Sequence, residues 1–226
     1  MYNVFKNYKK VPGEIVEAYA KLEESASINE SMPKKDGALH SSLRPVWPES
    51  RMCGTALTVQ CGVADNIMLH KAITMAGPGD VLMVVNKGYS EAGGMFGGMM
   101  AATLKSRGAA GLVIEGGCRD TVLIKELGFP VFSQTISIKP ATKISSGAIN
   151  VPIIIGGVLV HPGDLVYGDN DGVVVVPREQ AEKVLKTAQE REERESGQLE
   201  KILRGEMTTF DFFAEEYARL DLKEEP

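Results

Sequence analysis

The strongest constraint on the fold of this chain is an alternation of strand-like and helix-like segments in its middle. Residues 80–85 and 111–114 are almost continuously apolar, which is typical of parallel strands buried on both faces. Residues 97–108 lie between them and predict a helix that ends at Gly108. Strands that alternate with helices in this way predict a layered α/β domain.

The alternation continues on both sides of this unit. Residues 54–61 alternate in polarity and are rich in β-formers, and residues 64–75 carry apolar side chains at helical spacing. Asp120 stands where an N-cap would precede a helix over 121–127. After residue 151 the pattern changes to short strands separated by glycine, which predicts an antiparallel-rich sheet. The remaining strands are expected at 130–132, 152–155, 158–160, 164–167 and 173–176.

The two ends of the chain differ from its middle. Residues 12–24 predict an amphipathic helix, and the polar, proline-containing stretch 25–49 predicts a long loop or short turns. Residues 178–204 predict one long helix, whose charged middle is typical of a solvated face with i,i+4 ion pairs. We therefore expect an α/β domain over 1–177 and a C-terminal helical extension over 178–226.

The composition excludes several classes of protein. With 226 residues, 43% of them hydrophobic, the chain can bury a core as one compact unit. Its net charge of −5 and the lack of a Lys/Arg block argue against a nucleic-acid partner. No stretch approaches the ~18 apolar residues of a membrane span, so we expect a cytoplasmic protein. Cys53, Cys61 and Cys118 lack zinc-site spacing and are expected to be reduced and structural.

The first candidate site is the sequence Gly-Gly-Cys-Arg-Asp at 116–120, between a buried strand and the start of a helix. The glycine pair lets the backbone approach a ligand closely. Arg119 and Asp120 project from the carboxyl end of a strand, where open α/β sheets bind ligands. The same residues also fit a structural arrangement, in which Arg119 pairs with an acidic neighbour and Asp120 caps the next helix.

A second glycine cluster, residues 93–98, leads into the helix that begins near Met99. Unpaired amides at a helix N-terminus bind anions such as carboxylates. Because this cluster and the 116–120 sequence both precede helices, we expect the two strand-to-helix junctions to face one pocket. The alternative is that these glycines serve packing or turn geometry only.

Three other groups receive structural interpretations. His70 lies beside apolar residues on a predicted helix and is expected to be a hydrogen-bonded packing residue. His40 and His161 lie in a loop and a turn, where we expect no catalytic role. Residues 169–171 are similar to part of a calcium loop but lack its distal glutamate, so we expect a hairpin turn there.

A series of short motifs occurs in a fixed order along the chain. They are Gly-Thr-Ala (54–56), Asp-Asn (65–66), His-Lys-Ala (70–72), Gly-Leu-Val-Ile-Glu-Gly-Gly-Cys-Arg-Asp (111–120), Gly-Phe-Pro-Val-Phe (128–132), Gly-Gly-Val (156–158), Pro-Gly-Asp (162–164), Gly-Asp-Asn-Asp-Gly-Val-Val-Val-Val-Pro (168–177), Arg-Glu-Glu-Arg-Glu (191–195) and Gly-Glu-Met-Thr-Thr (205–209). Together they resemble the RraA-like family from about Gly54 to Phe213. The last two are most similar to the 4-hydroxy-4-methyl-2-oxoglutarate and 4-carboxy-4-hydroxy-2-oxoadipate aldolases of that family.

The resemblance implies a layered αββα-type sandwich of the swivelling-domain kind, assembled as a homotrimer or homohexamer. It implies a metal-dependent aldolase that cleaves a 4-hydroxy-2-oxo diacid to pyruvate and a second oxo acid. A bound Mg²⁺ or Mn²⁺ would chelate the 2-oxo acid and stabilise the enolate as a Lewis acid. Because loss of CO₂ from oxaloacetate gives the same enolate, decarboxylation is an expected side activity.

The resemblance also implies roles for individual residues. Asp120 would help to hold the metal, largely through water, and Arg119 would contact the 2-oxo group. The substrate carboxylate would lie on the helix-start amides of Met99 and Met100, after Gly98. Lys143 would lie in the pocket. Finally, Glu195 would reach the site from a neighbouring subunit.

The chain departs from the family pattern at one of these positions. The family usually has Asp or Glu where this chain has Gly98, and that acid is expected to organise metal waters or proton transfer. Its absence weakens the expectation of ordinary aldolase turnover. Substitute carboxylates considered from the sequence are Glu91, Glu115 and Asp65.

Two other classes of function fit the same motifs. A non-catalytic regulator that binds another protein would explain the missing acid at Gly98, although the intact Arg119–Asp120 pair favours an enzyme. A lyase for a different hydroxy acid would keep the metal and pyruvate half-site and change the pocket around Met95, Phe96 and Gly98.

Overall fold

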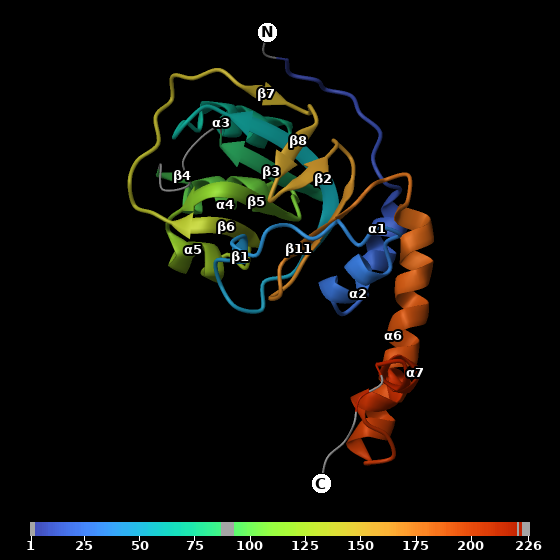
Figure 1. The fold of residues 1–226 in the computed structure, drawn as a ribbon. Helices are drawn as coiled ribbons and strands as arrows, with labels where there is room; N and C mark the ends of the chain where they lie inside the picture. Colours follow the sequence, from blue (N-terminus) through green and yellow to red (C-terminus); the bar gives the residue numbers. More distant parts are fainter. Residues whose placement is uncertain (1–2, 87–92, 221, 223–226) are drawn as a thin grey trace.

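The structure, a computed structural model, describes residues 3–86, 93–220 and 222 (Figure 1). Its largest element is one mixed sheet with the strand order β1-β6-β5-β3-β2-β10-β11. The four strands β6, β5, β3 and β2 are mutually parallel, and β10 and β11 continue the sheet in antiparallel fashion. These strands are β2 (Met52–Cys61), β3 (Asp80–Asn86), β5 (Gly111–Cys118), β6 (Val131–Ile136), β10 (Leu165–Gly168) and β11 (Val173–Val176).

Short strands add to this sheet. Strand β1 pairs with β6, β4 pairs with β5, and β7 pairs with β2, whereas β8 and β9 form a separate two-stranded ribbon. Their bounds are β1 (Arg44–Pro45), β4 (Gly94–Phe96), β7 (Ala148–Ile149), β8 (Ile153–Ile155) and β9 (Val158–Val160). The antiparallel half is therefore confirmed, but most of it belongs to the main sheet and only the ribbon stands apart.

The main sheet curls until its two ends approach each other. Phe132 on β6 packs against β10, because a Cβ added to Gly168 would lie 2.9 Å from Phe132 Cζ. Next to it, Arg44 Nη1 donates a hydrogen bond of 2.8 Å to the carbonyl of Asp171, in the turn after β10. Two β layers therefore face each other across the space enclosed by the curl.

Three apolar cores separate the layers, and alternate residues of each strand point into different cores. On β2 and β3, Leu57 and Leu82 point outward under the helices α3 (Ile67–Met75), α4 (Gly98–Ser106) and α5 (Thr121–Glu126). Ala56 and Val81 point instead into the core between the two β layers, where they meet Val166 and Val175. The layered αββα arrangement is thus confirmed.

The third core lies outside β10 and β11. Tyr167 and Val174 pack there against α1 (Gly13–Tyr19), α2 (Ser25–Glu30) and the start of the long helix α6 (Ala181–Leu203). The buried hydroxyl of Tyr19 donates a 2.8 Å hydrogen bond to the carbonyl of Ala181, which ties α1 to α6. The long C-terminal helix is confirmed. The stretch 25–49, predicted as loop, contains the helix α2, so that prediction was incomplete.

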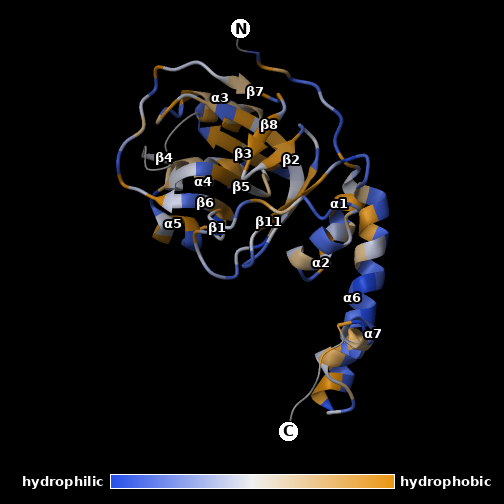
Figure 2. Cartoon of the chain, viewed as in Figure 1, coloured by the Kyte–Doolittle hydropathy of each residue, from blue (hydrophilic) through white to orange (hydrophobic). Residues whose placement is uncertain are grey.

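The outer part of α6 leaves the body of the molecule (Figure 1). The buried residues of α6 are Ala181, Val184 and Ala188, all in its first third. Figure 2 shows β2 and β3 mainly in the hydrophobic colour and the middle of α6 in the hydrophilic colour. A 3₁₀ turn (Thr209–Phe212) and α7 (Ala214–Ala218) follow. No helix among the described residues is both long enough and apolar enough to cross a membrane.

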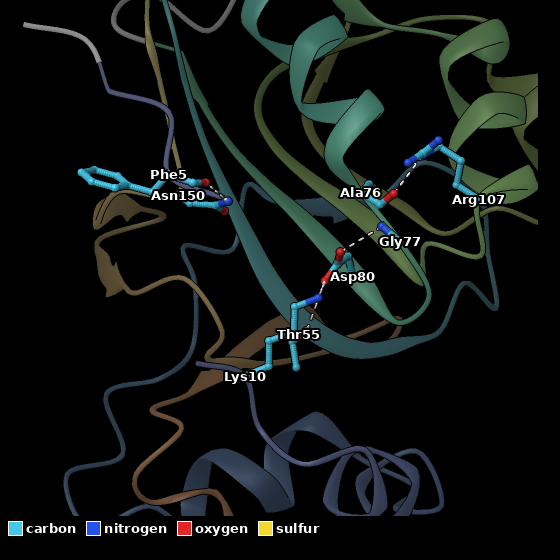
Figure 3. Close-up of polar contacts among 8 residues, drawn as sticks. All are labelled: Phe5, Lys10, Thr55, Ala76, Gly77, Asp80, Arg107 and Asn150. Atoms are coloured by element: carbon cyan, nitrogen blue, oxygen red, sulfur yellow. Dashed lines mark hydrogen bonds and ion pairs between the residues drawn. The ribbon is translucent and has the colours of Figure 1, made fainter. Parts of the chain in front are cut away.

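The N-terminal segment crosses the sheet at the amino end of β3 (Figure 3). The carboxylate of Asp80 is the centre of this contact: Oδ1 pairs with Lys10 Nζ, and Oδ2 accepts a 3.0 Å hydrogen bond from the amide of Gly77. Further along the segment, Asn150 Nδ2 donates a 2.8 Å bond to the carbonyl of Phe5. The Asp80 contacts fix the edge of the sheet that is opposite the carboxyl ends of its parallel strands, and the Asn150 contact fixes the segment beside β7.

Candidate active site

A pocket of about 190 Å³ opens where β4, β5 and the start of α4 meet. This volume is below the ~300 Å³ of typical drug-sized sites, so the pocket suits a small metabolite. The structure brings together here most of the residues singled out from the sequence. The pocket is lined by Asn66, His70, Gly94, Met95, Phe96, Gly97, Met99, Met100, Arg119, Asp120 and Lys143.

Asp120 lies at the carboxyl end of β5 in a left-handed conformation, with φ of 59°. It stands at the N-cap position of α5, as predicted, but its side chain makes no capping hydrogen bond to that helix. Instead Oδ2 accepts a 3.0 Å hydrogen bond from the amide of Gly98, the first residue of α4. The side chain is 48% exposed, so the carboxylate remains accessible from the pocket.

Arg119 lies beside this carboxylate without forming a tight ion pair. Its Nε is 3.9 Å from Asp120 Oδ2, and its side chain is 46% exposed. The backbone amide of Arg119 donates a 3.0 Å bond to the carbonyl of Phe96, which fixes β5 against β4. The guanidinium is therefore held near the pocket while most of its donors stay available to a ligand.

The glycines of the 93–98 cluster permit this close packing. A Cβ on Gly97 would lie 2.6 Å from Asp120 Oδ2, and a Cβ on Gly94 would lie 2.3 Å from the carbonyl oxygen of Ser137. A Cβ on Gly117 would meet the carbonyl oxygen of Gly93 at 2.2 Å. The packing interpretation of these glycines therefore holds, and it coexists with a pocket at the same place.

The start of α4 offers one unpaired amide to the pocket. Met100 and Ala101 both donate backbone hydrogen bonds of 3.0 Å to the carbonyl of Gly97. In the part of the chain that the structure describes, the amide of Met99 has no hydrogen-bond acceptor. An anion in the pocket would find this donor at the positive end of a nine-residue helix.

Lys143 and His70 also line the pocket. Partial desolvation and then the positive charge of Lys143 lower the pKa of His70, so its ring is neutral near pH 7. His70 is exposed, and no hydrogen bond of its side chain is present among the described residues. The prediction that His70 is a hydrogen-bonded packing residue was therefore wrong, because α3 turns this position toward the pocket.

Comparison with known proteins decides the family. The RraA-like (Aldolase/RraA) family matches residues 16–175 of the chain. The chain belongs to the RraA-like family. A Halalkalibacterium halodurans protein, provisionally named a 4-hydroxy-4-methyl-2-oxoglutarate aldolase, is 39% identical over 154 residues, which cover 68% of this chain and 73% of that protein.

Solved structures agree with this assignment. Streptomyces coelicolor RraAS2, described as an unusual member of the RNase ES inhibitor RraA family, matches with a TM-score of 0.75 and 29% identity, covering 85% of this chain and 98% of that chain. An uncharacterized Pseudomonas syringae protein matches with a TM-score of 0.77 and 26% identity, covering 88% and 97%. The family therefore includes relatives with aldolase names and relatives named as inhibitors.

Gly98, where this RraA-like chain lacks the expected acid, is buried and lies behind the pocket lining. A Cβ there would be 2.5 Å from Leu123 Cδ2 and 3.4 Å from Asp120 Cβ. Of the substitutes considered from the sequence, the two that the structure describes do not fill this place. Glu115 binds the amide of Gly156 and is absent from the lining, Asp65 is fully buried, and Glu91 lies outside the described residues.

Glu195 is not brought to the pocket of its own chain. It lies on α6, where its carboxylate forms a 2.7 Å ion pair with Arg191. Figure 1 shows α6 on the side of the molecule away from β4. A role for Glu195 in a neighbouring subunit's site stays a prediction, as do the catalytic and binding roles of the other predicted residues.

The donor set suits a metal held by few protein ligands. Asp120 is the sole carboxylate of the described pocket lining, and the described residues contain no group of three or more His, Cys, Asp or Glu side chains placed to hold a metal ion. Mg²⁺ is commonly held by one or two carboxylates together with waters and substrate oxygens. The exposed carboxylate of Asp120 fits this kind of site and not a preformed cage of protein ligands.

The cysteine beside Arg119 is buried, and its thiol is held in the protonated, weakly nucleophilic form. Burial is the largest effect that raises the pKa of the Cys53, Cys61 and Cys118 thiols to about 12, so these thiols stay protonated at neutral pH. All three cysteines are free, in agreement with the structural role expected from the sequence. The titratable side chains of the described pocket lining are Arg119, Lys143, His70 and Asp120.

Proposed function

We propose that this protein is a divalent-metal-dependent aldolase that cleaves a 4-hydroxy-2-oxo diacid to pyruvate and a second oxo acid. The main support is the gathering of Arg119, Asp120, Lys143 and the unpaired amide of Met99 around one small pocket. These groups supply two positive charges, a helix N-terminus and one carboxylate. A small dianion and a divalent cation together complement that set.

The substrate is oriented by its two carboxylates. The C1 carboxylate accepts a hydrogen bond from the amide of Met99 at the positive end of α4. Lys143, which also lines the pocket, binds the second carboxylate. Arg119 then lies beside the 2-oxo oxygen, where its planar fork of donors suits an oxygen that gains negative charge.

Cleavage breaks the bond between C3 and C4 of the substrate. The 4-hydroxyl loses its proton, C4 becomes the carbonyl carbon of the second oxo acid, and the bonding electrons form the enolate of pyruvate. Protonation at C3 then gives pyruvate. Arg119 stabilises the enolate oxygen, and His70, whose lowered pKa keeps its ring neutral, is the group we assign to accept the hydroxyl proton.

Asp120 is the residue that would hold the metal. Its Oδ2 is anchored by the amide of Gly98, and the exposed part of the carboxylate faces the pocket. When bound, Mg²⁺ or Mn²⁺ supplies Lewis-acid stabilisation of negative charge on the oxygens of the 2-oxo acid. The same half-site accepts oxaloacetate, so decarboxylation is the expected side activity.

Release of pyruvate from 4-hydroxy-4-methyl-2-oxoglutarate tests this proposal. EDTA should abolish the reaction, and Mg²⁺ or Mn²⁺ should restore it. Asp120→Ala should lower metal-dependent turnover by about 10²-fold or more, the range for loss of transition-state charge stabilisation. Asp36→Ala, at an exposed position outside the pocket, serves as the control. A pyruvate-release rate that does not change with EDTA contradicts the metal-dependent mechanism.

A protein-binding regulator is the second candidate function. Two observations favour it: the structural match to RraAS2 of the RNase ES inhibitor family, and glycine at position 98. A thermal-shift measurement with Mg²⁺ plus pyruvate or oxalate separates the two candidates. Stabilisation that requires both metal and oxo acid supports the enzyme, and no shift with either ligand supports the regulator.

A further inference from the structure

The segment after β6 forms one wall of the pocket and is attached on both sides of it. On the β4 side, the amide of Gly94 donates a 2.7 Å hydrogen bond to the carbonyl of Lys139. On the α3 side, Thr142 donates its amide to the carbonyl of Ala64 at 2.8 Å and accepts at 3.0 Å from the amide of Asn66. Residues 139–145, which we call the wall segment, therefore span the pocket.

Asp65 is the centre of the attachment on the α3 side. Its side chain is fully buried, and its carboxylate accepts four hydrogen bonds. Oδ1 accepts from the amide of Ile67 at 3.0 Å. Oδ2 accepts from the hydroxyl of Thr142 at 2.8 Å and from the amides of Ile144 and Ser145 at 2.6 and 3.0 Å. Three of the four donors thus belong to the wall segment.

The charge of Asp65 fits this arrangement. Burial raises the pKa of its carboxyl, but the hydrogen bonds from Ile144, Ile67, Thr142 and Ser145 outweigh burial and hold the pKa below its usual range. The carboxylate is therefore ionised at neutral pH. Each of its bonds is charge-assisted and stronger than a bond between neutral groups.

Lys143 lies between two residues that are bound to the same carboxylate oxygen. Thr142 and Ile144 both donate to Asp65 Oδ2, and the Lys143 side chain between them lines the pocket. We propose that Asp65 is a positioning residue that directs Lys143 into the pocket, toward the second carboxylate of the substrate. The proposal rests on the proposed function for the role of Lys143, and on hydrogen-bond geometry for the role of Asp65.

Glycine contacts restrain the far end of the same segment. A Cβ on Gly62 would lie 2.4 Å from Ser145 Cβ, and a Cβ on Gly147 would lie 1.9 Å from the carbonyl oxygen of Gln60. The backbone after Lys143 thus packs directly on the end of β2. Asp65 holds the residues on both sides of Lys143, and the glycine contacts fix the backbone that follows, so the segment has little freedom to turn Lys143 away.

The pKa of His70 is a reporter of the position of Lys143 that does not depend on catalysis. The charge of Lys143 contributes to lowering that pKa, so Lys143→Met should raise it. If Asp65 positions Lys143, Asp65→Ala should also raise it, and the double variant should show no further rise. If Asp65 acts on stability alone, loss of its negative charge should leave the pKa of His70 unchanged or lower it. NMR titration of the three histidines measures these shifts.

Amide hydrogen exchange gives a second test of the role of Asp65. Asp65→Ala should speed exchange at Ile144 and Ser145 while leaving the strands β2 and β5 protected. Thr142→Val, which removes one donor and keeps the backbone bonds, should produce a smaller change in the same direction. Asp164→Ala is the matched control, because Asp164 is a buried carboxylate that binds the amides of His161 and Arg178 outside the pocket.

Turnover completes the test. Misplacement of a substrate-positioning group by about 1 Å can cost about 10²-fold, so Asp65→Ala and Lys143→Met should each lower kcat/KM to that extent. The double variant should be no slower than Lys143→Met alone. If the wild type shows no aldolase activity, the proposed function fails, whereas the His70 pKa and the amide exchange still decide the role of Asp65. Wild-type values of both in Asp65→Ala overturn the inference.

Discussion

The pocket and the C-terminal extension differ in how far their side chains are buried or hydrogen-bonded within a single chain. Met95 and Phe96 of the pocket lining are fully buried, as is Cys118 next to Arg119, and Asp65 accepts hydrogen bonds from four donors. The extension has the opposite character. Most of its apolar side chains on and after the second half of α6 are exposed: Leu199, Leu203, Phe210, Phe212, Phe213, Leu220 and Leu222.

This difference indicates which part of the molecule depends on contacts with a second subunit. The inner wall of the pocket is built from contacts within the chain. A charged helix that leaves the body gains stability chiefly from contacts made elsewhere, and a run of exposed apolar residues marks a surface for such contacts. The homotrimer or homohexamer expected from the resemblance would supply those contacts and would carry Glu195 to another subunit.

The largest expected effect tests whether the pocket is chemically complete without an acid at position 98. Gly98→Glu should raise aldolase turnover, because a lost proton-transfer group typically costs about 10²–10⁴-fold. The new Cβ requires Leu123 to move, and Leu123 is a flexible side chain that is 39% exposed. Steady-state kinetics with 4-hydroxy-4-methyl-2-oxoglutarate measures the change.

Gly98→Ala separates the steric effect from the chemical one in this experiment. It adds the same Cβ against Leu123 without a carboxylate, so it should not raise turnover. The opposite result is rapid turnover by the wild type and loss of activity in Gly98→Glu. It would mean that glycine makes room for a different substrate, and the lyase for another hydroxy acid would replace the present proposal.

Arg119→Lys should have the next largest effect. A lysine keeps the positive charge but loses the planar fork, so turnover should fall by about 10²–10³-fold, as when an oxyanion-stabilising donor is removed. The melting temperature should change little, because the side chain is 46% exposed and its Nε is 3.9 Å from Asp120 Oδ2. Activity within twofold of wild type would show that charge alone suffices.

The extension is tested by Leu199→Glu together with Leu203→Glu. Both leucines are exposed in the single chain, at 56% and 78%, so the substitutions should leave the melting temperature of an isolated subunit unchanged. If the extension is a subunit interface, the mass measured by light scattering should fall. Glu193→Gln on the same helix is the control. A wild type that is already a monodisperse monomer would contradict the shared-subunit site.

The smallest expected effect is in the acid stability of the pocket wall. The pKa of folded Asp65 lies below its usual range, so this group contributes stability above the unfolded pKa and loses it as the pH falls through the folded pKa. Asp65→Asn should therefore flatten the acid limb of the melting-temperature profile. Asp164→Asn should not, because burial raises the pKa of Asp164. Equal acid limbs in wild type and Asp65→Asn would contradict this prediction.

The sequence predicted the elements whose burial determines their structure. Strands β3 and β5 are apolar runs covered on both faces, and α4 ends close to its expected glycine. It missed α2 and β4, which depend on distant contacts. At the start of α2, the amide and the hydroxyl of Ser25 donate hydrogen bonds of 2.7 and 2.8 Å to the carboxylate of Asp169. Strand β4 begins at a glycine of the 93–98 cluster, and its extended backbone depends on pairing with β5.

The residues of the candidate site divide in the same way into those that could be predicted from local sequence and those that could not. Arg119 and Asp120 were indicated by their place after a buried strand, and Met99 by its place at a helix start. Lys143 came from the family resemblance alone, because nothing local marks a lysine in a long connection as a pocket residue. His70 was misjudged and Asn66 was not singled out as a pocket residue, because the direction in which α3 faces depends on the wall segment that packs across its start.

The hydrogen bond from the amide of Gly98 to the carboxylate of Asp120 connects two proposed ligand positions. These are the cation position at Asp120 and the anion position at the start of α4. Any cation at Asp120 also polarises the first amide of α4, the helix whose next amide faces the anion. Occupancy of the two positions is thereby thermodynamically linked. If the cation tightens the binding of the oxo acid by some factor, the oxo acid must tighten the binding of the cation by the same factor, so the protein should take up the pair cooperatively.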